Sequence, residues 1–139
     1  MAAILTFIAS HASPPIQLVF QLLVVPVVDN TASPSGEPHA SWLENAKTPQ
    51  LNIGRMLWFR NNYLPNKEDW PRWNSSPLLA PEEWFGKVPN AWIGVAELDI
   101  LRDEGLAYAE KLRKAGKEVE VKVYQRAPHP IMAMDGELR

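Results

Sequence analysis

The chain contains no cysteine, and this absence excludes disulfide bonds, thiolate zinc sites and cysteine nucleophiles from its 139 residues. Histidine is scarce as well. The three histidines lie at positions 11, 39 and 129, without the close spacing that is typical of metal ligands. We therefore expect neither a metal site nor a bound cofactor.

An excess of charge of one sign is also lacking. The chain has 14 Lys and Arg residues against 16 Asp and Glu residues, which gives a net charge of −2. Binding to nucleic acid normally requires a basic face, so we expect no nucleic-acid partner. The composition, 46% hydrophobic and 22% charged, favours a globular chain with a buried core.

Long apolar runs are absent too. Residues 1–10 (MAAILTFIAS) are apolar, but they fall far short of the roughly 20 residues that span a bilayer. No Lys or Arg precedes them, as it would in a signal peptide. The apolar side chains of this segment recur at helical spacing, which favours a buried helix; they are Ile4, Leu5, Phe7 and Ile8. We expect no membrane span and a cytoplasmic location.

Three apolar stretches predict strands. Residues 17–28 (QLVFQLLVVPVV) form an almost continuous apolar run, which is typical of a strand buried on both faces of a parallel sheet. Pro26 should end its hydrogen-bond ladder, because proline has no backbone N–H. Residues 91–96 (AWIGVA) predict a second strand. Residues 119–124 (VEVKVY) alternate apolar with polar side chains, which predicts a third strand near a sheet edge.

Helices are predicted between these strands. Residues 101–115 predict an amphipathic helix, and Gly116 follows where a left-handed residue is expected. Residues 41–64 predict helix in pieces, and residues 65–89, rich in Pro and Trp, an ordered loop. The alternation of strand and helix predicts the α/β class with parallel pairing.

Several acidic residues follow the second predicted strand. Asp99 comes just after it, and His129 comes just after the third. An acid after one strand and a histidine in the loop after the next predict the acid and base of a catalytic triad. Asp103 and Glu104 predict a capping or surface role, because acidic groups are favourable in the first turn of a helix.

Several segments carry a family resemblance. They are QLLVVPVVD, SPLLAPEE, VAELDILRDEGLAYAEKLRKAG and residues 119–129. In this order they resemble the C-terminal half of the hormone-sensitive-lipase-like carboxylesterases, and the resemblance covers nearly the whole chain. It implies a partial α/β-hydrolase fold with about three parallel strands and flanking helices, in a single truncated domain over residues 1–139.

The resemblance also implies roles for five residues. Asp99 takes the position of the triad acid and His129 that of the triad base. Trp58, Phe59 and Tyr63 fall where the family lines its substrate pocket, which implies a small-molecule substrate.

The nucleophile of the family has no counterpart in this sequence. The family serine lies in a G-x-S-x-G motif that precedes the helix expected at residues 1–10, and the motif does not occur here. The serines at positions 10, 13, 33, 35, 41, 75 and 76 lie at helix ends or in loops. Loss of nucleophile and oxyanion donors costs several powers of ten in rate, so we expect the isolated chain to be a poor esterase.

Two alternatives to ester hydrolysis remain open. Asp99 and His129 could act as an acid/base pair without a covalent step, in an isomerase, lyase or cyclase. The chain could also be a pseudoenzyme or an interaction module that keeps the fold without catalysis.

A partner is predicted as well. In the family, the segment that corresponds to Ile16–Val25 pairs with a preceding strand. That preceding strand has no counterpart in this sequence. An unpaired apolar edge invites pairing with another chain. We expect a homodimer or a complementary protein partner at this edge.

Overall fold

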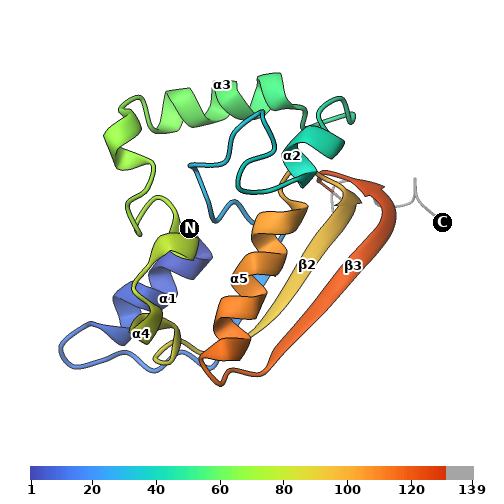
Figure 1. Ribbon diagram of the computed structural model, residues 1–139. Helices are drawn as coiled ribbons and strands as arrows, with labels where there is room; N and C mark the ends of the chain where they lie inside the picture. Colours follow the sequence, from blue (N-terminus) through green and yellow to red (C-terminus); the bar gives the residue numbers. More distant parts are fainter. Residues whose placement is uncertain (131–139) are drawn as a thin grey trace.

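The computed structural model, which describes residues 1–130, has a parallel sheet of three strands at one side of the molecule, with helices packed on one face (Figure 1). The strands are β1 (Phe20–Val24), β2 (Asn90–Leu98) and β3 (Val119–Pro128), in the order β1-β2-β3. Leu22 lies opposite Trp92. The predicted α/β class and the three parallel strands are confirmed.

Five α-helices and two short 3-10 helices connect or flank the strands. They are α1 (Ala2–Ser10), α2 (Ser41–Glu44), α3 (Ile53–Tyr63), η1 (Lys67–Asp69), η2 (Pro77–Leu79), α4 (Glu82–Phe85) and α5 (Arg102–Lys114). The predicted loop at residues 65–89 thus contains three short helical turns. Gly116 has a φ of 81°, in agreement with the left-handed residue expected after α5.

The main core lies between the sheet and the helices α1, α4 and α5. Phe7 of α1 and Tyr108 of α5 both pack on the ring of Phe85, with centroids 5.3 and 5.6 Å apart. Leu23 and Ile93 point from the sheet into the same cluster. This packing joins the first helix to α5, far away in the sequence.

The strand β1 is an edge strand with one open face. The prediction that residues 17–28 are buried on both faces is wrong, because only Phe20–Val24 enters the sheet. Leu23 is buried, whereas Phe20 and Leu22 on the other face are 52% and 61% exposed. Among the described residues, helices cover only one face of the sheet. The apolar side chains of β1 on that face are buried, and those on the other face are exposed.

The carboxyl ends of β2 and β3 lie beside α2 (Figure 1). Trp42 of α2 and Met56 of α3 form a second buried cluster with Ile100 and Leu101, which follow β2. Ligand sites of parallel α/β sheets lie at this end of the sheet. The second cluster therefore fixes the framework around the predicted acid and base.

Within residues 1–130, no helix is both long and apolar enough to cross a membrane.

The helix α5 approaches β2 closely at Gly105. A Cβ atom placed on Gly105 would lie 2.8 Å from Cγ1 of Val95, closer than real Cβ atoms come. We expect Gly105→Ala to lower the free energy of unfolding by about 1–3 kcal/mol, because the helix must move away from the sheet. Urea unfolding measures the effect.

A matched control is available in α3. A Cβ atom on Gly54 would meet only Oδ1 of Asn52, at 3.4 Å. Alanine forms helix better than glycine does, so Gly54→Ala should leave stability unchanged or raise it. Equal losses in the two variants would show that the contact with Val95 is not the cause.

Candidate functional site

Asp99 and His129 meet at the carboxyl edge of the sheet. Asp99 follows β2 and is 1% exposed, and its Oδ2 lies 2.8 Å from Nδ1 of His129, which follows β3. Its Oδ1 accepts a hydrogen bond from the backbone N–H of Leu101 at 3.0 Å. A carboxylate accepts only, so Nδ1 of His129 is the donor, and Nε2 is the ring nitrogen that can accept a proton.

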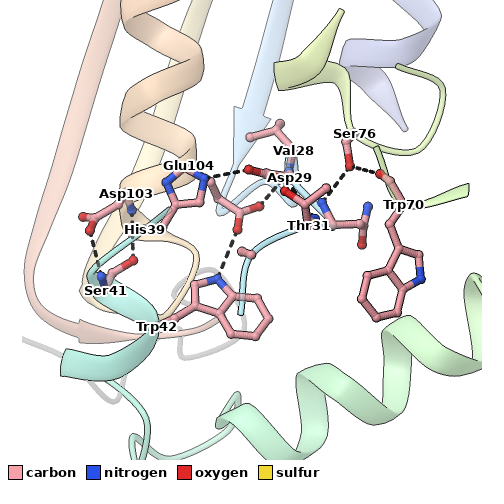
Figure 2. Close-up of polar contacts among 12 residues, drawn as sticks. Val28, Asp29, Thr31, His39, Ser41, Trp42, Trp70, Ser76, Asp103 and Glu104 are labelled. Carbon is pink, nitrogen blue, oxygen red and sulfur yellow. Dashed lines mark hydrogen bonds and ion pairs between the residues drawn. The ribbon is translucent and has the colours of Figure 1, made fainter. Parts of the chain in front are cut away.

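The turn that carries Asp99 is held by α2. The hydroxyl of Ser41 donates to the carbonyl of Ile100 at 2.7 Å. Its backbone N–H donates to the carboxylate of Asp103 at 2.7 Å (Figure 2). The side-chain amide of Asn45 donates to the carbonyl of Asp99 at 3.1 Å. These bonds pair the backbone carbonyls of Asp99 and Ile100 in the turn after β2. They fix the backbone from which the carboxylate of Asp99 projects.

His129 opens into a cavity of about 420 Å³. Its walls include Met1 and Ile4 at the beginning of α1, together with Phe59 and Tyr63 of α3. The structure therefore brings two of the three predicted substrate-binding residues to the same cavity as the predicted base.

The third, Trp58, lies outside the lining of this cavity. Its side chain is 62% exposed, and its ring packs edge-on against Phe59 with centroids 5.1 Å apart. Phe59 and Tyr63, four residues apart, lie on one side of α3 and line the cavity, whereas Trp58 is not among the lining residues.

The cavity also has polar walls that the sequence did not reveal. Asn30, Arg60 and Ser75 line it. The side-chain amide of Asn30 donates to the carbonyl of Ser75, and Nη1 of Arg60 donates to the carbonyl of Asn30 at 2.9 Å. The guanidinium of Arg60 lies 3.9 Å from the ring centroid of Trp70. No local pattern marks these residues, because their partners lie far away in the sequence.

The carboxyl group of Glu104 is fully buried between the loop after β1 and α2 (Figure 2). Its Oε1 accepts the backbone N–H groups of Val28 and Asp29 at 2.8 and 3.1 Å, and Oε2 faces Nε1 of Trp42 at 3.4 Å. The predicted surface role of Glu104 is wrong. It caps the loop after β1 instead. Burial raises the pKa of Glu104 to about 8, although its hydrogen bonds act in the opposite direction.

Asp29 and His39 form a second buried acid–histidine pair. Oδ2 of Asp29 lies 2.9 Å from Nε2 of His39, and Oδ1 accepts hydrogen bonds from the N–H and hydroxyl of Thr31. Burial raises the pKa of Asp29, but the bonds from His39 and Thr31 outweigh it and leave the pKa lowered. The side chains of His39 and Asp29 are 8% and 1% exposed, so the pair fixes the loop after β1.

Asp103 and the remaining histidine have structural contacts. The carboxylate of Asp103 accepts the backbone N–H of Ser41 at the start of α2, and the N-cap residue of its own helix α5 makes no side-chain cap bond. His11 ends α1 and lies outside the cavity. No group of three or more His, Asp or Glu side chains in the described part of the chain could hold a metal ion.

Comparison with known proteins identifies the family. A family profile for the alpha/beta hydrolase fold matches residues 1–133. The chain belongs to the α/β-hydrolase family. An AB hydrolase superfamily protein of Schizosaccharomyces pombe is 48% identical over 130 residues, which are 94% of this chain and 37% of that protein.

Named esterases are also similar to this α/β-hydrolase chain. Carboxylesterase NlhH of Mycobacterium tuberculosis is 35% identical over 122 residues, 87% of this chain and 36% of that enzyme. A thermostable esterase from Pseudomonas putida ECU1011 superposes with a TM-score of 0.83 and 37% identity, over 93% of this chain and 39% of that one. The chain thus spans little more than a third of the length of the relatives it matches.

The buried carboxyl of Glu104 predicts a pH-dependent stability. Its pKa is about 8 in the folded chain, against an ordinary value of 4.5. The contribution of the protonated group is fully present below pH 4.5, and it is lost as the pH rises through about 8. We expect Glu104→Gln to flatten this decline of the free energy of unfolding, by up to about 1.4 kcal/mol per pH unit.

Urea unfolding between pH 4.5 and 8.5 measures the slope. Glu120→Gln is the matched control, because Glu120 is exposed on β3. Parallel slopes for the wild-type chain and Glu104→Gln would contradict the raised pKa.

Proposed function

We propose that this chain contributes the acid and the base of a carboxylic-ester hydrolase site of the hormone-sensitive-lipase-like type. The observation that carries the proposal is the 2.8 Å contact between Asp99 and His129 on the wall of a cavity. The esterase names of its relatives support the same activity.

The same cavity indicates where the nucleophile belongs. Met1 and Ile4, at the beginning of α1, line the cavity together with His129. In this family the serine stands at a turn from a strand into a helix, with its hydroxyl exposed over the sheet. We propose that the serine lies directly before α1, on a polypeptide segment that is not part of residues 1–139.

The chemistry then follows from the geometry. Nε2 of His129 takes the proton of the serine hydroxyl as its oxygen attacks the acyl carbonyl. His129 next donates that proton to the leaving alcohol, and water repeats the sequence on the acyl-enzyme. Asp99 holds the imidazole in the required tautomer and stabilises its positive charge.

The substrate that fits this cavity is a small ester. Phe59 and Tyr63 are aromatic walls for its apolar part, and Trp58 supports Phe59 from outside. We further propose that residues 1–139 act as one unit in the cytoplasm; residues 131–139 lie outside the described part.

A fused protein tests the proposal. Replacing the corresponding part of the Pseudomonas putida esterase by this chain restores a complete hydrolase sequence. We expect it to hydrolyse p-nitrophenyl butyrate. His129→Ala should lower kcat on the order of 10⁴-fold or more, because the general base is removed. Asp99→Asn should lower kcat about as much, because the imidazole is no longer held in the required tautomer.

The matched control is His11→Ala, which changes an exposed histidine outside the cavity. It should leave kcat unchanged. A folded fusion that is inactive, or whose activity survives His129→Ala, would overturn the proposal.

The isolated chain separates this proposal from the alternatives. We expect no adduct with a fluorophosphonate probe, measured as intact mass. Ser75 is the serine on the cavity wall, with a side chain that is largely buried. An adduct that His129→Ala abolishes would place the nucleophile in this chain. Proton-transfer activity without an adduct would instead favour an isomerase, lyase or cyclase, and an inert fusion would favour a pseudoenzyme.

The exposed edge at β1 is the surface we propose for a partner. Ile16 and Val19 before the strand, and Phe20 and Leu22 within it, are 59%, 93%, 52% and 61% exposed. β1 pairs only with β2 in the described sheet, so its other side is open to a further strand. A second copy of this chain, or the complementary segment that carries the serine, would cover it.

Charge placed on this edge should prevent pairing. We expect the wild-type chain to sediment as a dimer at micromolar concentration. Phe20→Lys/Leu22→Lys should shift it to a monomer, because buried ammonium groups would lose their hydration. The control Glu120→Lys/Lys122→Glu changes exposed charges on β3. A monomeric wild-type chain would contradict the homodimer.

A further inference from the structure

The strand β3 changes its register just before His129. Ala96 of β2 pairs with Tyr124, but Leu98 pairs with Pro128. Glu97 therefore faces three residues of β3 where a regular ladder would have one. Bulges of this kind bend a strand and redirect the side chains that follow. Here the bulge lies between the sheet and the histidine that must reach Asp99.

The centre of the bulge has an unfavourable backbone conformation. Arg126 has a φ of 58°, in the left-handed region that residues with a Cβ atom rarely adopt. Its backbone N–H donates to Oε2 of Glu97 at 2.6 Å. The carboxylate of Glu97 thus satisfies an amide that the interrupted ladder does not pair.

Glu97 is itself fixed by two other elements. Its backbone carbonyl accepts hydrogen bonds from the side-chain amide of Asn45 and from Nη1 of Arg102, each at 3.3 Å. Arg102 is in turn paired with Glu44 of α2 at 2.7 Å. The side-chain amide of Asn45 therefore bonds both to Glu97, which holds the bulge, and to the carbonyl of Asp99.

We propose that Glu97 is a positioning residue for the base. Its carboxylate holds the Arg126 amide in the left-handed turn, and this turn places the imidazole of His129 within hydrogen-bond distance of Asp99. Two carboxylates, two residues apart, hold the same segment. Asp99 binds the imidazole, and Glu97 binds the backbone three residues before it. The catalytic part of this role rests on the proposed esterase function, whereas the effect on His129 does not.

Nuclear magnetic resonance of the full 139-residue chain tests the effect on His129. The proton on Nδ1 that bonds to Asp99 gives a downfield resonance, and the Arg126 amide should exchange slowly. We expect Glu97→Ala to broaden or remove the resonance and to speed the exchange. Glu97→Gln should preserve both, because its side-chain oxygen still accepts the amide hydrogen bond.

A second variant separates positioning from general loss of structure. Glycine adopts a positive φ without strain, so Arg126→Gly in the Glu97→Ala background should restore the resonance. If Glu97→Ala alone does not fold, this double variant is compared with Arg126→Gly. The proposal is overturned if the resonance is unchanged in the folded Glu97→Ala chain, or if the Ala and Gln variants behave alike.

The fused esterase supplies the second readout. Glu97→Ala should lower kcat roughly 10- to 100-fold with KM unchanged, since misplacing a catalytic group costs rate more than binding. Glu97→Gln should stay near the wild-type kcat. An inactive wild-type fusion with an altered resonance in Glu97→Ala rejects the esterase function alone. An active fusion with an unaltered resonance rejects the positioning role alone.

Discussion

The carboxyl group of Glu104 joins the loop after β1 to the first turn of α5, and the geometry around the cavity depends on this buried contact. Val28 and Asp29 lie in the loop after β1, and Oε1 of Glu104 accepts the backbone N–H groups of both. An unsatisfied buried amide is costly, so the contact fixes where the loop lies relative to α5. The helix α5 begins three residues after Asp99. The contact with Glu104 therefore fixes both the cavity wall at Asn30 and the segment that carries Asp99.

Around this anchor, polar contacts at the carboxyl edge form two groups with different purposes. The pair of Asp29 and His39 is enclosed and immobilises the loop after β1. The pair of Asp99 and His129 has the same chemistry, but its imidazole is 22% exposed and reaches the cavity. Exposure of the imidazole to a cavity, more than the presence of an acid–histidine pair, marks the site at which proton transfer is feasible.

The chain also shows an imbalance between its two sheet faces. Helices α1, α4 and α5 bury one face, while Phe20 and Leu22 remain exposed on the other and the edge of β1 is unpaired among the described residues. Natural proteins rarely leave such an edge uncovered. The beginning of α1, where the proposed serine belongs, lies at the cavity beside His129, whereas Phe20 begins β1 at the amino end of the sheet.

The sequence by itself indicated three parallel strands, the helix α5, and Asp99 and His129 as a candidate acid and base, because apolar periodicity and the order of acid and base along the chain are local signals. It did not determine that Glu104 is buried, that Trp58 points away from the cavity, or that Glu97 bonds to Arg126. Those outcomes depend on packing between segments far apart in the chain, and on how many helices cover each face of the sheet. Only the tertiary structure decides them, because a polar side chain finds its partner after the backbone has brought distant segments together.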